Sequence, residues 1–434
     1  MIVYFLGFVI RTVILFCFIY EFVLAAIPYS LFSSRKIAFV IMGGYFIVKR
    51  YSLHPLFSNK LYRKLLYSCL FCCIYVSILY FLHIGIGSSA VGWFVYFPMY
   101  SIIGSFLCAG FFDWNYEELI KSIAIVTIFQ AFWCILTFYN FEIRLLNESL
   151  FIIEEDANID FLVESRVRSI GGAGASLSII LAFSSFSFLY FILKEKKIFV
   201  NSCFYIVCAF ATFLVGTTGM LIFLASLSCV LLSITKRKRN IIFIIFIFFS
   251  FSFFISETSK FMDIDKYDNL TYKMNDFFTN ADQSGTMLSL SHQKVPPISF
   301  ETIIGTGLSR GRTFSGLICT HDGGYYRTYF GLGLIMTILF YVILYLTMYR
   351  MLNRNNINNS MKLLFVTYLI MCVIIEYKEP FMFRYIPFFL YAIYCAKIQE
   401  DCGYIVGQKK NKNKIIKQYL VNYTFNRLKI NELH

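Results

Sequence analysis

The polar residues best suited to chemistry lie between positions 256 and 330, in a stretch rich in glycine and tyrosine. Its segment from His321 to Arg327 reads HDGGYYR. Histidine titrates near neutral pH, and a neighbouring Asp322 can orient the ring or raise its affinity for a proton. We therefore predict that His321 and Asp322 form a catalytic pair, with His321 as the general base for a substrate hydroxyl. A surface histidine in a turn is the alternative interpretation.

Arginines accompany this segment and a second glycine-rich one. Arginine binds phosphate oxygens through a planar, two-pronged group that lysine lacks. Residues 169–174 read SIGGAG and open an apolar segment. A helix beginning there would present free N–H groups to an anion, and glycines let the anion approach. We predict a phosphate-binding site, with interfacial anchoring and close helix packing as the alternative. The predicted substrate-binding residues are Arg166, Arg168, Gly171, Gly172, Arg310, Arg312, Tyr325, Arg327 and Arg384.

No metal or cofactor is expected at this site. The chain has no GxxxxGK[ST] or HExxH motif and no Cys/His set with zinc spacing. Asp263 and Asp265 have the DxD spacing with which many sugar transferases hold a metal–nucleotide, but this is a weak signal in a polar loop. Most cysteines lie in apolar segments and are expected to be small buried thiols. A reaction here must therefore use a substrate that is already activated.

The rest of the chain is strongly apolar. Hydrophobic residues make up 58% of it and charged residues 15%, with a mean hydropathy of +0.67. A soluble protein of this length needs more charged surface, so we predict an all-α polytopic integral membrane protein. The positive-inside rule explains the net charge of +14 better than binding to nucleic acid, and we expect no nucleic-acid partner.

About twelve apolar segments are long enough, or nearly so, to cross a bilayer. Basic clusters follow every second segment, which predicts that both termini are cytoplasmic. Residues 1–397 then form the membrane domain and 398–434 a basic cytoplasmic tail. The loops 140–172 and 256–330 face the other side, and the longer one lies between spans nine and ten. The predicted spans are 10–31, 36–48, 65–85, 90–111, 119–139, 173–193, 198–214, 218–235, 241–256, 329–349, 362–377 and 383–397.

This pattern resembles the Wzy-type O-antigen polymerases, which are distantly related to the O-antigen ligases and share their GT-C-like helical architecture. The ligases carry a functional histidine just before a helix, and His321 occupies a similar place. An Arg-x10-Gly motif of some polymerases is matched once, by Arg312 and Gly323. The other residues that carry the resemblance are Arg166 or Arg168 with Gly171 and Gly172, then Gly305, Gly307, Asp322, Gly324, Tyr325, Gly331 and Gly333.

The resemblance implies a glycosyltransferase of the bacterial inner membrane whose active site faces the periplasm. Its donor would be a glycan on undecaprenyl diphosphate, and its acceptor a repeat unit on the same carrier. Membrane lipids and a chain-length regulator would be its other partners. Arginines would stabilise the leaving diphosphate without a metal.

Two other classes remain open. A flippase for the lipid-linked unit would also be polytopic and arginine-lined, but it needs charges along a membrane-centre cavity and no long outer loop. A transferase using a polyprenyl monophosphate sugar often has acidic residues in its first outer loop. Here that loop contains Ser33, Ser34, Arg35 and Lys36, which argues against this class.

Overall fold

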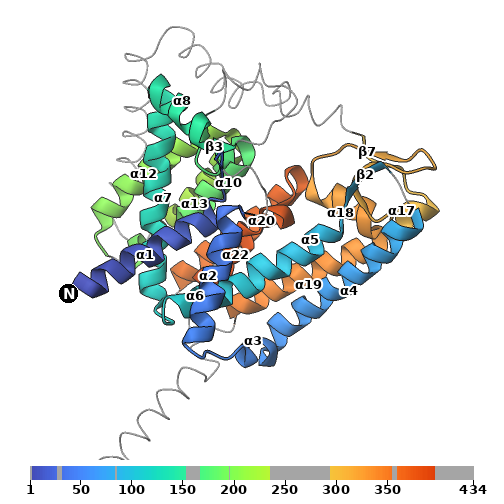
Figure 1. Cartoon of the computed structure of the whole chain (residues 1–434), viewed down its shortest axis with the longest axis horizontal. Coiled ribbons are helices and arrows are strands. Elements are labelled where there is room, and N and C mark those ends of the chain that lie inside the picture. The colour runs from blue at the N-terminus through green and yellow to red at the C-terminus, as the bar shows by residue number, and fades with distance from the viewer. Residues whose placement is uncertain are drawn as a thin grey trace, which may run out of the picture.

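The computed structural model describes residues 2–26, 32–83, 86–152, 167–194, 196–234, 294–353 and 359–395. The expected span 241–256, the polar stretch up to residue 293, Asp263 and Asp265, and the basic tail lie outside these ranges. Within them the chain is mostly helical, and its long helices pack against one another in one bundle (Figure 1).

Six helical segments of the described chain are long and apolar enough to cross a membrane, and the protein is membrane-embedded. Large apolar side chains on their outer surfaces, such as Phe81 and Phe129, are at least half exposed and suit contact with lipid. The six segments are Lys60–Leu82, Val91–Phe111, Tyr116–Tyr139, Gly174–Leu193, Ile198–Val215 and Leu334–Asn353.

After α1, the first half of the bundle follows the predicted spans closely. Its helices are α1 (Ile2–Ile19), α2 (Ser34–Val48), α3 (His54–Ser58), α4 (Lys60–His83), α5 (Val91–Tyr96), the π-helical stretch η2 (Phe97–Ile103), α6 (Gly104–Phe111), α7 (Tyr116–Tyr139) and α8 (Phe141–Leu150). Asn115 and Asn140 begin α7 and α8 by accepting hydrogen bonds from backbone N–H groups of the first turn.

The second half contains α10 (Gly174–Ser184), α11 (Phe186–Leu193), α12 (Ile198–Val215), α13 (Thr217–Ile234), α17 (Phe300–Ile304), α18 (Gly324–Leu332), α19 (Leu334–Asn353), α20 (Asn359–Lys378), α21 (Phe381–Arg384) and α22 (Ile386–Tyr394). The single predicted span 329–349 is wrong in its boundaries, because Gly333 at φ +82° separates α18 from α19. Similarly, Tyr385 at φ +48° separates α21 from α22 inside the predicted span 383–397.

The predicted first span, 10–31, is also wrong: α1 begins near the N-terminus and ends at Ile19. Side chains of α2 explain where it ends. Ser34 donates to the carbonyl of Cys17 and Arg35 to that of Phe18, at 2.9 and 3.0 Å. These bonds satisfy carbonyls that a longer helix would otherwise use. Arg35 also pairs with Glu21 at 2.6 Å, so Glu21 lies beyond the helix rather than inside a span.

Short strands join distant loops. β1 (Val23–Leu24) pairs antiparallel with β3 (Phe151–Ile152), and β4 (Arg168–Ser169) with β5 (Gly172–Ala173). The three-stranded sheet has the order β2 (Ile86–Ser89), β6 (Leu308–Arg312), β7 (Ile318–Cys319), with Gly87 opposite Gly311. This sheet lies with α17 and α18 at one end of the bundle, which we call the α18 end (Figure 1).

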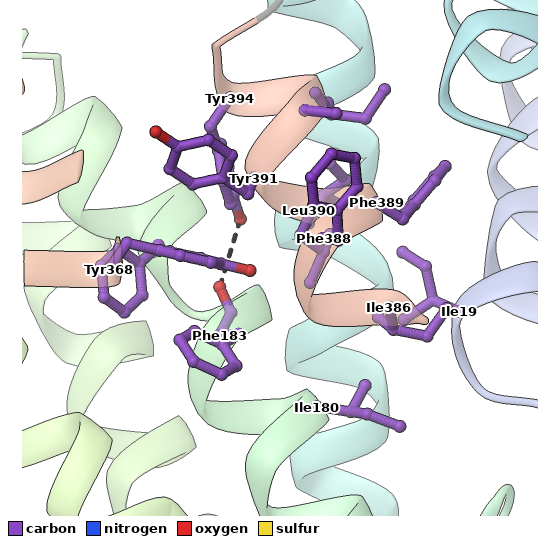
Figure 2. Close-up of a cluster of buried hydrophobic side chains, with 14 of the residues drawn as sticks. Ile19, Ile180, Phe183, Tyr368, Ile386, Phe388, Phe389, Leu390, Tyr391 and Tyr394 are labelled. Carbon is purple, nitrogen blue, oxygen red and sulfur yellow. Dashed lines mark hydrogen bonds between the residues drawn. The ribbon is translucent and has the colours of Figure 1, made fainter. Parts of the chain in front are cut away.

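The core around α22 is rich in tyrosine. Figure 2 shows Tyr368 of α20 between Phe183 of α10 and the tyrosines of α22. Buried tyrosines need partners for their hydroxyl groups. Tyr368, Tyr391 and Tyr394 donate to backbone carbonyls at 2.6, 2.7 and 3.0 Å, and so tie α22 to α20, α19 and α10.

Candidate functional site

Two arginines converge on one carboxylate at the α18 end. Arg310 projects from β6 and Arg327 from the first turn of α18, while Asp322 lies in the turn that connects β7 to α18. The guanidinium nitrogens lie 3.5 and 3.6 Å from the same Oδ1 of Asp322. The Asp322 side chain is 44% exposed, so the group faces solvent. Of the predicted residues, these three are brought together.

A second ion pair continues the cluster. Arg384 of α21 binds Glu379, just after α20, at 3.2 Å. The charge of Glu379 also acts on Arg327, so the two pairs are neighbours. Three arginines gathered around two carboxylates offer planar N–H donors that suit an anionic ligand. Burial lowers the pKa of Arg327, because it removes water from the charged form, and the nearby Arg310 acts in the same direction.

His321 is buried, with 5% of its surface exposed, so it is not the surface histidine of the alternative interpretation. Its Nδ1 accepts a 2.9 Å hydrogen bond from the N–H of Gly323. A neutral ring in this arrangement carries its proton on Nε2 and has no second lone pair to act as a base. Its ring packs against Tyr326 at 4.0 Å between centroids, and its carbonyl accepts from Arg327. His321 therefore holds the turn that presents Asp322 and Arg327.

We expect acid to destabilise the protein through His321. Burial lowers the pKa of His321 from its usual 6.5, with Asp322 raising it and Arg327 lowering it. The folded protein thus binds the proton less readily than the unfolded chain does. The contribution of His321 to the stability of the folded protein is complete above about pH 6.5 and is lost as the pH falls through the lowered pKa.

Melting temperatures of the purified protein, measured from about pH 7 to about pH 5.5, should fall more steeply for the wild type than for His321→Gln. The exposed His54→Gln should keep the wild-type slope. Equal slopes for all three proteins would contradict this role.

The start of α18 rests on a buried carboxylate. Glu376 of α20 has no exposed surface and accepts a 2.5 Å hydrogen bond from the hydroxyl of Tyr341 of α19. Its Oε1 occupies the space that a Cβ at Gly324 would fill. The preceding Gly323 packs equally closely against the carbonyl of Tyr377. Because the carboxyl group of Glu376 lies directly against the first residue of α18, it fixes where that helix begins relative to α20.

Gly324→Ala should therefore be strongly destabilising. The added methyl group has no space beside Glu376, and overpacking of this kind costs about 1–3 kcal/mol. Thermal unfolding in detergent measures the loss. Gly44→Ala is the matched control, because Gly44 lies in helix α2 with open space around its Cα. A Gly324→Ala protein that unfolds at the wild-type temperature would show that the helix can move away from α20.

Two predicted residues do not join the charged cluster. The hydroxyl of Tyr325 contacts Tyr345 and the carbonyl of Val373, both at 3.0 Å, so this side chain ties α18 to α19 and α20. Arg312 is exposed on β6, two residues beyond Arg310. Within the described ranges it forms no ion pair with Asp322.

The glycine-rich segment before α10 forms a turn between two short strands, and only part of it is described. Arg166 lies outside the described residues, and only the backbone of Arg168 is placed, in β4 opposite Ala173. Gly171 and Gly172 have φ of +83° and +115°, which favour glycine, and they turn the chain from β4 into β5. Gln130 of α7 holds this turn by donating to the carbonyl of Ile170 at 2.6 Å.

The glycine turn and the charged cluster are connected through α13. Ser178 of α10 accepts a hydrogen bond from the N–H of Gly219 at 3.2 Å. Nearby, Lys378 at the end of α20 donates to Thr218 at 2.8 Å. Since Lys378 directly precedes Glu379, the starts of α10 and α13 and the end of α20 lie at the same end of the bundle.

The positions of Glu376 and Tyr377 beside the turn before α18 were not predicted from the sequence. The glycine pair at 323–324 was a sequence signal for this close packing, because adjacent glycines before a helix indicate that another element approaches closely. Within the described ranges no three His, Cys, Asp or Glu side chains are grouped as metal ligands would be.

Comparisons with protein-family models, with curated proteins and with solved structures find no match to this chain. The site is therefore interpreted from its own geometry.

Proposed function

We propose that this chain is a Wzy-type O-antigen polymerase with about twelve spans and a GT-C-like architecture in a bacterial inner membrane. It would transfer a growing glycan from undecaprenyl diphosphate to a repeat unit on the same carrier, at the periplasmic face. The observation that carries the proposal is the pair of arginines around Asp322 at the α18 end. A membrane-embedded bundle with such a group at one end suits a substrate with a lipid tail and a diphosphate.

The geometry favours exchange of the diphosphate with Asp322. Distances of 3.5 and 3.6 Å are longer than tight charge-assisted hydrogen bonds of about 2.7–2.9 Å. The guanidinium groups of Arg310 and Arg327 are thus not locked onto the carboxylate. A diphosphate offers them more negative charge and more acceptor oxygens than one carboxylate does.

In the proposed reaction, the bond between the donor anomeric carbon and the diphosphate oxygen breaks, and a bond from that carbon to the acceptor hydroxyl oxygen forms. Charge accumulates on the leaving undecaprenyl diphosphate, where Arg310 and Arg327 stabilise it. Once Arg310 and Arg327 have moved from Asp322 to the diphosphate, the acceptor hydroxyl gives its proton to the Asp322 carboxylate. His321 is a positioning residue in this scheme, since its Nδ1 is engaged with Gly323. The anomeric carbon passes through an oxocarbenium-like state, as in other glycosyl transfers.

Deletion of the gene in its native host, followed by gel analysis of lipopolysaccharide, tests the proposal. A polymerase mutant retains one repeat unit on the lipid core, and complementation with the wild-type chain restores the ladder of lengths. The alternative function, a flippase for the lipid-linked unit, would leave the core without any repeat unit. A deletion strain with an unchanged ladder would exclude both functions.

A further inference from the structure

An exposed tyrosine lies beside the charged cluster. Tyr377, at the end of α20, is 55% exposed, and its ring meets that of Tyr326 edge-on with centroids 5.7 Å apart. Tyr326 in turn packs on the ring of His321 at 4.0 Å. A hydrogen bond with Tyr377, together with burial, raises the pKa of Tyr326 to about 12. The three rings form a continuous row of tilted and edge-on contacts from a buried histidine to an exposed tyrosine.

Backbone packing holds Tyr377 next to Asp322. The carbonyl of Tyr377 lies so close to Gly323 that a Cβ there would overlap it. Gly323 is the residue after Asp322, so the exposed ring and the exposed carboxylate belong to one surface. Neither can move away without opening the contact between α20 and the turn before α18.

We propose that Tyr377, backed by Tyr326, is a sugar-binding platform that stacks against a pyranose ring of the acceptor repeat unit. The face of an aromatic ring carries partial negative charge and attracts the partially positive C–H groups of a sugar. Asp322 beside it accepts hydrogen bonds from sugar hydroxyls. The inference rests on the proposed function: the arginines of the site would bind the diphosphate, and Tyr377 would bind the sugar.

A tyrosine at the end of a membrane helix also suits the lipid interface. Two observations favour a sugar for Tyr377. Its ring is held by Tyr326 rather than lying freely, which lowers the entropy lost on binding a rigid ligand. It also adjoins a carboxylate and two arginines, which favour a polar, anionic substrate over lipid tails. The lipid-interface and sugar-binding interpretations differ in which side chain can replace Tyr377. Leucine also suits the lipid interface, whereas stacking on a sugar needs an aromatic face.

Three variants of Tyr377 test the platform in the full-length protein. The substrate is the lipid-linked repeat unit that accumulates in the deletion strain. Tyr377→Phe keeps the ring and should stay within about threefold of the wild type. Tyr377→Leu and Tyr377→Ala should raise the acceptor concentration needed for half-maximal rate about tenfold, which corresponds to ~1.4 kcal/mol, with little change in maximal rate. Tyr139→Leu, at an exposed tyrosine ending α7, is the control and should behave as the wild type.

A binding measurement separates this inference from the proposed function. The oligosaccharide released from the same lipid by mild acid is titrated into the purified wild type and variants, with thermophoresis as the readout. Weaker binding by Tyr377→Leu than by Tyr377→Phe supports the platform, even if the protein proves not to polymerise. Wild-type binding and wild-type kinetics in Tyr377→Leu overturn the platform while leaving the polymerase function intact.

Discussion

Replacing Arg327 with lysine should lower polymerisation about 10²–10³-fold, the usual effect of removing one donor from a developing negative charge. Lysine keeps the positive charge, but it loses the planar fork that can hold two diphosphate oxygens at once. Arg327 is 16% exposed, so its orientation is set by the protein rather than by solvent. The chain-length ladder and the rate with purified lipid-linked repeat unit both measure the effect.

Arg310→Lys separates binding of diphosphate from structural effects. Arg327 also donates to the carbonyl of His321 at 3.2 Å, so its replacement can disturb the turn. Arg310 is half-exposed on β6 and faces the same carboxylate, and its lysine variant should lose activity without a change in melting temperature. Arg144→Lys, in an ion pair with Glu148 on α8, is the control. Wild-type rates in both Arg310→Lys and Arg327→Lys would rule out the arginine site.

Most helix positions could be predicted from hydropathy, because a membrane helix needs a long apolar segment whatever its tertiary contacts. The errors lie where side chains from elsewhere end a helix. The end of α1 depends on Ser34 and Arg35, which bind its last carbonyls from α2. The break between α18 and α19 depends on the close packing of Gly333 against the backbone of Ile304 in α17. Hydropathy contains no information about either contact.

The site was predictable where its residues are neighbours in the chain. Asp322 and Arg327 lie within one segment, and Arg310 is joined to them by a short hairpin. The burial of His321 was not predictable, because it results from packing by Tyr326 and from the end of α20, some fifty residues further along. For the same reason, the sequence could not show that Glu376 supports α18 or that Tyr377 adjoins Asp322.

Asp322→Asn should reduce the rate of polymerisation about 10²–10⁴-fold, the range expected for a positioned general base. Asparagine has nearly the same shape and can still accept hydrogen bonds, but it does not take up the proton of the acceptor hydroxyl. Glu301→Gln is the matched control. Glu301 is a carboxylate of the same region, on α17, that binds Ser315 and lies outside the charged cluster. It should polymerise at the wild-type rate.

The dependence on donor concentration decides what Asp322 does. In the wild type, Asp322 competes with the diphosphate for Arg310 and Arg327. Its neutral replacement removes that competition, so Asp322→Asn should bind the lipid-linked donor at least as tightly as the wild type while its turnover falls. If Asp322 only positioned the arginines, its loss would weaken donor binding and turnover together. A fall in both would therefore overturn the assignment of the base, whereas a fall in turnover alone would identify Asp322 as the group that accepts the proton.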